Sequence, residues 1–524
     1  MAELDLSDIV VSWLRQMVTN SKVVKLDALA SLLEGQRKTG QKLVHCHGVF
    51  DLLHIGHIRH FEQARKLGDI LIVTLTEDQH VNKGPDRPAF HQDLRAEAIA
   101  ALQCVDYVAV NQWPTATETI RLLKPDFYVK GTEYKDPAQD VTGKIREEES
   151  AVREVGGQLV FTEDIQFSSS SLINKHFNGF SNEQSEYLDS FKRKNSANDI
   201  LGWLDRAASL KVLVVGETII DDYHYCEAIG KAGKEPVLVA RHIASEQFAG
   251  GVLAIANHIA GFCKEVAVLS FLGAKDSKLD FITDKLKPNV VPHFLYQKNS
   301  PTIVKRRFVE NYLLQKLFEV YFLEPNPNPV EEEAALCNRL SQLLPHYDLV
   351  VTADYGHGML TQETIRKLCE ESRFLAVNTQ SNAGNTGYHT ISLYPRADYV
   401  CLANHELAMD LRSRRGDVDA MILDVAKRLR SSHFTVTRGK YGITTYRSGV
   451  GFAKSPAFTQ QVTDRIGSGD AVLSVTSLLA YLGASPEILA FVGNVAGCEA
   501  VKTLGHRSFI ERIPFYKHIQ TLLK

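Results

Sequence analysis

The stretch "HGVFDLLHIGH", residues 47–57, follows a short apolar run and carries three histidines and two glycines within eleven positions. An apolar run that ends in glycine and is followed by a helical pattern predicts a strand that turns into a helix near Gly56. In an open parallel sheet, ligands bind at the carboxyl ends of the strands, where helix N-termini direct N–H groups at anions. His54 and His57 flank Gly56 at this point and are suited to donate hydrogen bonds to phosphate oxygens. A metal site is the alternative, although no third ligand at a suitable spacing accompanies the two histidines.

The flanking sequence has the pattern of a doubly wound α/β domain. Short apolar runs, typical of buried parallel strands, alternate with helical stretches such as "IRHFEQARKLG" and "DLRAEAIAALQ". The expected strands are "KLVHC", "DILIVTL", "DYVAV", "DFYVKG" and "QLVFTE". We therefore predict one doubly wound domain over residues 41–177, preceded by a helical segment over residues 1–40.

A second α/β domain follows a polar boundary. Residues 178–200 are rich in Ser, Asn and Lys, which predicts a linker. Residues 201–524 then contain the strand candidates "KVLVVGE", "EVAVLSFLG", "DLVVTADYG", "RFLAVNT", "DYVCLAN" and "HFTVTRG". The stretch "PVLVARHIASEQFAGG" predicts a small β lid on this second domain.

Bulk composition limits the classes of protein to which the chain can belong. Its 524 residues suggest more than one domain, and 44% hydrophobic with 23% charged residues is typical of a globular protein. A net charge of -3 gives no basic field for nucleic acid, and no apolar run approaches the roughly 18 residues of a membrane span. Eight cysteines without a C-x-x-C motif, and an N-terminus without an export pattern, favour reduced thiols in the cytoplasm. The expected partners are therefore small molecules and further copies of the chain, as a homodimer.

Residues 41–176 resemble the HxGH nucleotidyltransferase superfamily, which includes cytidylyltransferases and the adenylyltransferase half of the bacterial bifunctional heptose kinase/adenylyltransferase. The similarity extends from "HIGH" to "KGPDRPAF", "LRAEAIAAL", "VKGTEY" and "SSSSLIN". It implies a Rossmann-like fold, catalytic roles for His54, His57 and Lys83, and attack of a sugar phosphate on the α-phosphorus of a nucleoside triphosphate with Mg²⁺. The residues implied to bind the nucleotide are Val49, Phe50, Gly56, Arg87, Arg95, Lys130, Gly131, Ser169, Ser170 and Ser171. Taken singly, Lys83 and Arg87 would be surface charges and the serine run a helix cap, whereas together they suit a polyphosphate.

The stretch "TDRIGSGDAVLS", residues 463–474, places a glycine-rich turn before an apolar helix. Such a turn presents N–H groups to an anion, and Asp470 at its edge is suited to take a proton from an attacking hydroxyl. An N-capping aspartate after a flexible turn is an equally good interpretation of the same residues.

The second half resembles the ribokinase-like (PfkB) carbohydrate kinases, and specifically the kinase half of the heptose enzyme. "VVGETIIDDYHY" is similar to the opening motif of that family, "AGG" at 249–251 to its di-glycine, and "VTRGKYG" and "DRIGSGDA" to its nucleotide motifs. The resemblance implies that Asp470 is the catalytic base. It implies nucleotide contacts from Thr437, Gly439, Gly442, Gly467, Ser468 and Gly469, and substrate contacts from Asp221, Gly250, Gly251, Lys305 and Arg307. Lys305 and Arg307 could equally be edge-strand charges.

Several positions depart from the family pattern. Ala254 replaces an asparagine that helps to hold the sugar, and His357 stands where the heptose kinases commonly have lysine. The N-x-x-E segment that organises Mg²⁺ is represented only by "ANHEL", in which Glu406 is the candidate metal ligand and Asn404 lies one residue too close. The order of the two halves is also the reverse of that in the bacterial heptose enzyme.

The sequence therefore predicts a bifunctional transferase that makes a nucleotide-activated sugar, with ADP-heptose as the leading product. A cytidylyltransferase that acts on a polyol phosphate or another sugar phosphate is one alternative. The other is an active nucleotidyltransferase joined to a kinase-like domain that only binds ligands. Mg²⁺, ATP or CTP as substrate, and a monovalent cation in the kinase domain are the expected small ligands.

Overall fold

The structure is a computed structural model that describes residues 22–81, 87–135, 144–162, 180–312, 314–324, 329–459 and 462–524. The chain divides into two compact units. The first comprises the residues up to Gly179 together with Tyr516–Leu522 and Lys524, and the second comprises Phe180–Phe515 and Leu523. Within the described ranges, no helix is long and apolar enough to cross a membrane.

The first unit is built on a five-stranded parallel sheet with the strand order β3-β2-β1-β4-β5. The strands are β1 (Leu43–Gly48), β2 (Ile70–Thr76), β3 (Tyr107–Asn111), β4 (Phe127–Gly131) and β5 (Gln158–Thr162). β1 lies in the middle, with Leu43 opposite Ile70 of β2 and Val44 opposite Phe127 of β4. The strand order reverses at β1, so this edge of the sheet is the expected ligand site of a doubly wound fold.

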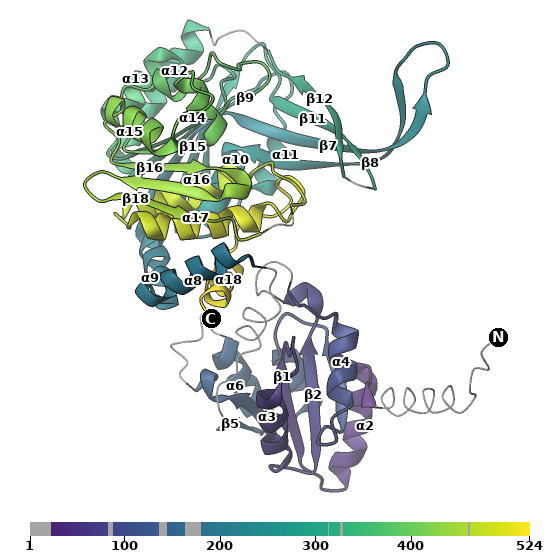
Figure 1. Cartoon of the computed structure of the whole chain (residues 1–524). Helices are drawn as coiled ribbons and strands as arrows, with labels where there is room; N and C mark the ends of the chain where they lie inside the picture. The colour runs from purple at the N-terminus through teal and green to yellow at the C-terminus, as the bar shows by residue number, and fades with distance from the viewer. Residues whose placement is uncertain are drawn as a thin grey trace, which may run out of the picture. The chain divides into compact units, whose positions relative to one another are not determined.

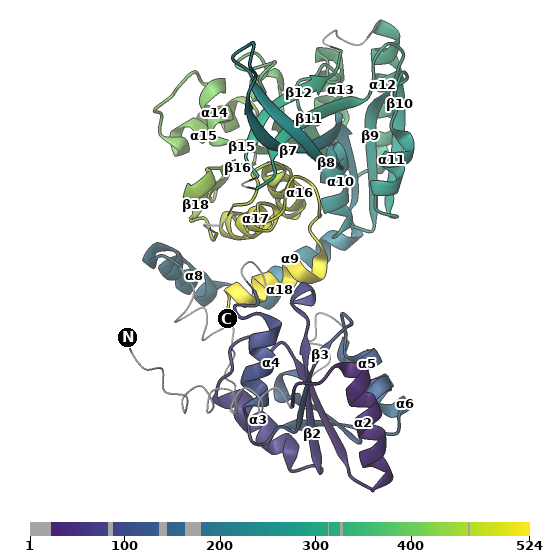
Figure 2. The same ribbon diagram turned by 90° about the vertical axis from the view of Figure 1, so that its right-hand side faces the viewer.

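Helices cover both faces of this sheet (Figure 2). They are α2 (Leu26–Lys38), α3 (Ile55–Arg65), α4 (Gln92–Ala100), α5 (Thr117–Leu123) and α6 (Lys144–Glu154). α3 and α4 pack on the face that carries Val44 and Val73, whereas α2 packs on the face of Leu43 and Ile72. α5 and α6 enclose Tyr128. The alternation of side chains along β1 explains why both faces are apolar, as the continuous apolar runs predict.

The second unit contains a nine-stranded sheet with the order β10-β9-β6-β13-β14-β15-β16-β17-β18. The strands are β6 (Lys211–Gly216), β9 (Glu265–Gly273), β10 (Val290–Gln297), β13 (Leu349–Asp354), β14 (Leu375–Thr379), β15 (Tyr399–Ala403), β16 (His433–Thr437), β17 (Ile443–Arg447) and β18 (Gly451–Ser455). All neighbours from β10 to β16 are parallel, and β17 and β18 extend the edge as an antiparallel meander. The two predicted α/β sheets are thus confirmed.

The predicted β lid is also confirmed, as a separate four-stranded sheet with the order β12-β11-β7-β8. Its strands are β7 (Thr218–Lys231), β8 (Leu238–Gly251), β11 (Ile303–Glu310) and β12 (Lys316–Phe322). β7 and β8 form a long antiparallel hairpin that extends away from the nine-stranded sheet (Figure 1). Its tip exposes apolar side chains, among them Ile229 and Leu238.

The helices of the second unit form layers on the large sheet. They are α8 (Asn182–Lys194), α9 (Ala197–Arg206), α10 (Val252–Ala260), α11 (Leu279–Lys285), α12 (Val330–Leu343), α13 (Gln362–Glu371), α14 (Asn404–Asp410), α15 (Val418–Arg428), α16 (Ser468–Tyr481) and α17 (Pro486–Ala500). The last helix, α18 (Arg512–Leu522), is divided between the two units after Phe515. α12, α13 and α15 bury Leu340, Leu368 and Ile422 against the strands in one continuous core. α16 and α17 are buried along most of their length, which fits their apolar sequences. Short 3₁₀ turns lie at Asp78–His80, Thr132–Tyr134, Ala207–Ser209, Leu344–His346, Ile391–Leu393 and Gly439–Tyr441.

The structure differs from the sequence prediction at the expected linker, residues 178–200. α8 begins at Asn182 behind a capping box on Ser181, and its Phe191 stacks on Phe491 of α17 with ring centroids 4.3 Å apart. A polar sequence with two buried apolar side chains, Leu188 and Phe191, therefore packs as a helix of the second unit. Of the helical segment predicted over residues 1–40, α2 is observed, and residues 1–21 lie outside the described ranges.

Candidate functional site

The two motif histidines meet at the start of α3, directly after the central strand β1. His54 is the N-cap residue, and its Nδ1 accepts a hydrogen bond of 3.1 Å from the N–H of Gly56. The rings of His54 and His57 stack with centroids 3.8 Å apart and an interplanar angle of 24°. Because Nδ1 of His54 is an acceptor, the neutral ring carries its proton on Nε2 and can donate it to a ligand.

Phe50, in the loop that follows β1, packs against this pair of histidines. Its ring meets His57 edge-on at 5.1 Å and Phe61 of α3 at 5.0 Å. Phe50 has a φ of 47°, and a Cβ on Gly48 would lie 2.9 Å from the Phe50 ring. A left-handed conformation costs a non-glycine residue roughly 1–2 kcal/mol, so the aromatic packing has to hold the loop in this shape. Such local strain is typical of functional sites.

Arg95 links the ends of β1 and β2 through hydrogen bonds to their main chains. Its buried guanidinium donates to the carbonyl oxygens of Val49, Thr76 and Phe90 and to the carboxylate of Asp78. The N–H groups of the guanidinium are therefore already bonded to acceptors within the protein. Arg95 therefore fixes the loop that carries the nucleotide contacts implied for Val49 and Phe50, and direct nucleotide contact by Arg95 itself stays a prediction.

Asp51 is a buried residue of this site that the sequence analysis did not single out. One carboxylate oxygen accepts from the N–H groups of Ala89 and Phe90, at 2.7 and 3.2 Å, and the other from Arg87 at 3.2 Å. Asp51 thereby joins the strand–helix turn to the R-P-A-F segment. The available signal was an aspartate in the otherwise apolar run "VFDLL" that precedes the H-x-G-H motif.

Lys130 and Gly131 lie at the end of β4, next to β1. The Lys130 ammonium forms an ion pair of 2.9 Å with Glu148 of α6 and lies over the rings of Tyr128 and Tyr134. Burial alone would lower the pKa of Lys130, but Glu148 and the two tyrosines hold that pKa well above its usual value. The lysine therefore stays charged beneath the site. Glu148 was not predicted because nothing in its charged helix distinguishes it.

The third histidine of the opening motif, His47, is hydrogen-bonded within the sheet. Its ring nitrogens contact the hydroxyls of Thr74 and Thr76 at 2.9 and 3.3 Å, and His45 contacts Thr74 at 2.7 Å. Burial, assisted by the positive charge of Lys130, lowers the pKa of His45 to about 3. These two histidines are neutral, structural members of β1. Lys83, Ser169, Ser170 and Ser171 lie outside the described residues.

In the second unit, Asp470 lies in the first turn of α16, behind the left-handed Gly467. The hydroxyl of Tyr355, from the loop after β13, donates to Asp470 Oδ1 at 2.9 Å. Gly467 has a φ of 80°, which favours glycine, and Ser468 and Gly469 open the helix. The glycine-rich turn thus presents a helix N-terminus beside a carboxylate, as the sequence predicts.

Asp221 lies on β7 of the lid and reaches the same place. Its Oδ1 accepts from Arg307 of β11, and its Oδ2 contacts His506 Nδ1 at 2.8 Å. His506 Nε2 lies 3.4 Å from Asp470 Oδ2. Burial would raise the pKa of Asp221, but Arg307 and His506 hold that pKa far below its usual value. We call Asp221, Arg307, Tyr355, Asp470 and His506 the C-terminal centre.

His506 was missed by the sequence analysis because it belongs to no motif and lies 285 residues from Asp221 in the chain. Burial would lower the pKa of His506, but hydrogen bonding and attraction to Asp221 and Asp470 raise it to about 9. The imidazole is therefore a cation at neutral pH, held between two carboxylates.

Close neighbours explain three further glycines of the kinase motifs, which are Gly250, Gly251 and Gly442. A Cβ on Gly250 would lie 2.3 Å from a carboxylate oxygen of Asp221, and Gly251 has a φ of 57°. Gly442, near Thr437 and Gly439 after β16, has a φ of 79°, and a Cβ there would lie 1.9 Å from the Ser455 carbonyl oxygen. Both segments therefore require glycine for steric reasons.

Lys305 is buried on the same face of β11 as Arg307 of the C-terminal centre. The Lys305 ammonium lies 5.0 Å from the ring centroid of Tyr321 and 5.9 Å from that of Tyr355. Burial lowers the pKa of Lys305, although Asp221 opposes this effect. A cavity of about 20 Å³, lined in part by Glu217, Thr302 and His357, lies near these residues.

Glu406, the candidate metal ligand, caps α14. Its two carboxylate oxygens accept from the N–H groups of Ser381 and Ala403, at 3.1 and 2.8 Å, and burial raises its pKa to about 7. Asn404 Oδ1 is buried and makes no hydrogen bond within the described residues. In the part of the chain that the structure describes, no three His, Cys, Asp or Glu side chains gather as a metal site.

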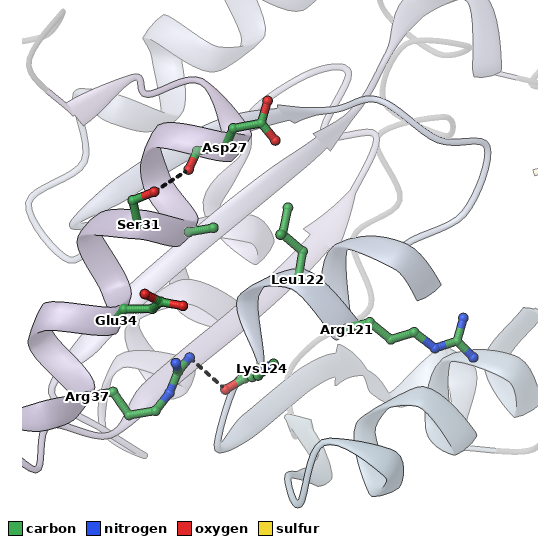
Figure 3. A pocket seen from close by; sticks show the side chains of 8 residues that line it. Asp27, Ser31, Glu34, Arg37, Arg121, Leu122 and Lys124 are labelled. Carbon is green, nitrogen blue, oxygen red and sulfur yellow. Dashed lines mark hydrogen bonds between the residues drawn. The ribbon is translucent and has the colours of Figure 1, made fainter.

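A larger cavity, of about 330 Å³, lies between α2 and α5 of the first unit (Figure 3). Arg37 crosses it and donates to the carbonyl oxygens of Leu123 and Lys124, and Ser31 bonds to the main chain of Asp27. Its lining includes none of the residues predicted to act on a substrate. The cavity therefore does not belong to the site at the carboxyl edge of the sheet.

Comparisons with known proteins match both units. Residues 45–176 match the cytidylyltransferase-like family, and residues 209–512 match the pfkB family of carbohydrate kinases. The "Bifunctional protein HldE" of Syntrophotalea carbinolica is 41% identical over 127 residues, which are 24% of this chain and 26% of that protein. The HldE of Trichlorobacter lovleyi is 35% identical over 169 residues, or 32% and 33% of the two chains. The chain thus spans a third or less of the length of these curated relatives.

A solved structure agrees with the fold of the second unit. Phosphofructokinase-2 from Escherichia coli, in complex with potassium, aligns with a TM-score of 0.50 and 14% identity. The alignment covers 60% of this chain and 100% of that protein. Because the pfkB match covers more than half of the chain, the protein belongs to the pfkB family of carbohydrate kinases, with a cytidylyltransferase-like domain ahead of the kinase domain.

Proposed function

We propose that the protein is a bifunctional transferase that makes a nucleotide-activated sugar. The first unit joins a sugar phosphate to a nucleotide, and the second phosphorylates a sugar or sugar phosphate with ATP. The observation that carries the proposal is the stacked pair of His54 and His57 at the N-terminus of α3. A helix N-terminus with two imidazoles at the carboxyl edge of a parallel sheet is suited to a phosphate in transfer.

In the first unit, an oxygen of the sugar phosphate attacks the α-phosphorus of the nucleoside triphosphate. A bond forms from that oxygen to the α-phosphorus, and the bond to the β-phosphate oxygen breaks, so that pyrophosphate leaves. No general base is needed because the attacking phosphate is already ionised. His54 Nε2–H, His57 and the N–H groups that open α3 stabilise the charge that develops on the phosphorus oxygens.

By the resemblance of their motifs, Lys83 is proposed as a further catalytic residue and Ser169, Ser170 and Ser171 as phosphate ligands. Arg87, which Asp51 orients, and the charged Lys130 add positive potential for the triphosphate. Magnesium supplies further charge neutralisation when it is bound with the nucleotide. In the second unit, Asn404 Oδ1 and the Glu406 carboxylate are oxygen ligands of the kind that magnesium takes, and the buried unpaired Asn404 oxygen supports their assignment.

The test of the first activity is pyrophosphate release from ATP and CTP with a panel of sugar 1-phosphates and polyol phosphates. His57→Ala should lower the rate by about 10²–10³, the loss typical of one preorganised donor in the transition state. The matched control is His80→Ala. His80 is a half-buried histidine that pairs with Glu77, so its replacement should leave the rate unchanged. A His57→Ala rate within a few-fold of wild type would remove His57 from the reaction.

In the second unit, Asp470 takes the proton of the acceptor hydroxyl. The hydroxyl oxygen then bonds to the γ-phosphorus of ATP, the bond to the β-phosphate oxygen breaks, and ADP leaves. The turn from Gly467 to Gly469 receives the phosphates. Asp470→Asn should lower sugar-dependent ATP turnover by about 10²–10⁴ and leave ATP binding unchanged. Equal turnover in wild type and variant would remove Asp470 as the base.

A kinase-like domain that binds ligands without turnover is the second candidate. It is favoured by the internal pairing of Asp221 with both Arg307 and His506, because these contacts occupy the carboxylate expected to hold the sugar. Wild-type protein that binds ATP but phosphorylates no member of a broad sugar panel would support this candidate.

We further propose ADP-heptose as the leading product, supported by the similarity to the HldE proteins, with CTP and a polyol phosphate as the alternative substrates. A monovalent cation is proposed for the kinase domain, supported by the potassium in the phosphofructokinase-2 structure. Comparison of ATP turnover in potassium and in lithium salts tests this cation site.

The free state of all eight cysteines supports a cytoplasmic location. Exposed apolar residues on the lid sheet, such as Leu238 and Phe318, support a homodimer.

A further inference from the structure

The imidazole of His506 touches three of the groups that phosphoryl transfer in the second unit requires. Its Nδ1 lies 2.8 Å from Asp221 Oδ2, and its Nε2 lies 3.4 Å from Asp470 Oδ2. A Cβ built on Gly467 would lie 2.5 Å from His506 Nε2, so the ring rests against the glycine turn. One side chain thus stands between the expected acceptor ligand, the base and the phosphate-binding turn.

The contacts around His506 also use the oxygens that an acceptor would need. Asp221 is bonded through Oδ1 to Arg307 and through Oδ2 to His506. Asp470 accepts from Tyr355 through Oδ1 and faces His506 with Oδ2. The His506 ring occupies the place between the two carboxylates, so an acceptor hydroxyl that bridges them has to displace the ring.

The ring of His506 is enclosed by the surrounding protein. The side chain of His506 is 4% exposed. An acceptor that bridges Asp221 and Asp470 therefore meets this ring first, so the described arrangement is a closed form of the centre.

His506 is carried by a short connection between α17 and α18. Gly505 before it has a φ of 52°, and its N–H donates to Asp464 at 3.0 Å. A loop residue behind a left-handed glycine can withdraw with little cost to the buried helices, because no helix or sheet hydrogen bond of its own has to break.

We propose that His506 is an internal lock on the C-terminal centre: its ring fills the place of the acceptor hydroxyl between Asp221 and Asp470. The centre transfers phosphate only where His506 has moved out. This inference rests on the proposed phosphoryl transfer by the second unit and names the residue that limits which acceptors reach it. If the ring is removed, water takes its place beside Asp470.

Water as the acceptor makes the lock testable without knowledge of the sugar. A water molecule gives its proton to Asp470, its oxygen bonds to the γ-phosphorus of ATP, and the bond to ADP breaks, so that phosphate and ADP form. We therefore expect His506→Ala to raise ATP hydrolysis by at least about tenfold over wild type, because a base contributes about 10²–10⁴ once a hydroxyl can reach it. His506→Ala combined with Asp470→Asn should lose this gain.

Two further variants distinguish the effect of the space that the His506 ring fills from the effect of its positive charge. His506→Gln keeps a side chain of similar length without the positive charge, so it should keep hydrolysis near the wild-type rate. His506→Ser opens the space and keeps a hydroxyl for Asp221, so it should behave as His506→Ala and replaces that variant if alanine does not fold. His433→Ala, which removes another buried histidine of the same unit, is the matched control and should not raise hydrolysis. Full-length protein, thermal unfolding and ATP binding are measured for each variant.

The outcomes separate the lock from the proposed function. A gain in the alanine or serine variant that disappears with Asp470→Asn supports the lock, even if wild type phosphorylates no sugar and the proposed kinase activity fails. Sugar-dependent turnover in wild type without any gain in the open variants overturns the lock and leaves the proposed function standing. A fall in hydrolysis in the open variants, or an equal gain in His506→Gln, also overturns the lock.

Discussion

Arg95 separates two explanations of the first unit: a clamp on the loop at the histidines or a direct ligand of the nucleotide. Its guanidinium is 1% exposed and donates to three main-chain carbonyl groups and to Asp78. Arg95→Ala would leave those acceptors without their donor inside the protein. We expect a large loss of folding free energy in the first unit.

The size of this loss follows from the contacts. An unsatisfied buried acceptor costs about 1–3 kcal/mol, and removal of one partner of a buried ion pair about 3–5 kcal/mol. Asp78 is 24% exposed and can be rehydrated, so the ion-pair loss adds little. The three carbonyl acceptors give about 3–9 kcal/mol, and the lower part of that range applies because water can enter beside Asp78. We therefore expect Arg95→Ala to destabilise the first unit by about 3–5 kcal/mol, and Arg95→Lys by somewhat less, because an ammonium cannot reach four acceptors at once.

Hydrogen–deuterium exchange of peptides from β1 and β2 measures the opening free energy of the first unit within the full-length chain. The control is Arg65→Ala, because Arg65 is 37% exposed and its ion pair with Asp106 is 3.5 Å long. That variant should lose less than about 1 kcal/mol. A loss below about 1 kcal/mol for Arg95→Ala, with weaker nucleotide binding, would refute the clamp and identify Arg95 as a direct ligand.

Three further predictions address the second unit. A fragment that starts at residue 180 should be more stable than one that starts at residue 201 by about 3–5 kcal/mol in chemical denaturation, because only the longer one keeps Phe191 stacked on Phe491. The pKa of His506 is about 9 in the folded protein, against an ordinary value of 6.5 that we take for the unfolded chain. The protonated imidazole therefore adds its full contribution to the free energy of unfolding below pH 6.5, and this contribution is lost as the pH rises through 9. Wild type should therefore lose about 3 kcal/mol by pH 10 in thermal unfolding, and His506→Gln should lose less. Leu238→Glu in the exposed hairpin should turn the proposed dimer into a monomer in analytical ultracentrifugation; an unchanged mass would place the interface elsewhere.

The architecture could be predicted from the sequence because each buried parallel strand is a short, continuous apolar run that can be recognised locally. Continuous apolar runs such as those of β1 and β2 mark strands that are covered on both faces, and glycines mark the turns at their ends. The same local chemistry identified His54 at the N-cap of α3 and Asp470 in the first turn of α16. The polar composition of α8 misled the prediction of a linker, because two buried residues are enough to dock a helix.

The partners of the site residues could not be predicted in the same way. Asp51 and Arg87, or Asp221 and His506, meet only after the chain has folded, and no spacing in the sequence records their contact. Glu148 is one of several glutamates in a charged helix, and only the fold selects it as the partner of Lys130. Charge pairing between distant segments is therefore the part of a site that motifs leave undetermined.

The two carboxylates of the kinase motifs lie close together and already have partners within the chain. A motif fixes the backbone that carries a carboxylate, and here it correctly brings Asp221 and Asp470 to one place. Whether a carboxylate can act depends on what else competes for its oxygens. In this chain Arg307 and the imidazolium of His506 compete for Asp221, so the second unit keeps the parts of a kinase in a paired, low-energy arrangement. An acceptor must supply enough binding energy to separate these pairs, and that requirement makes the His506→Ala variant more informative than any further substitution within the motifs.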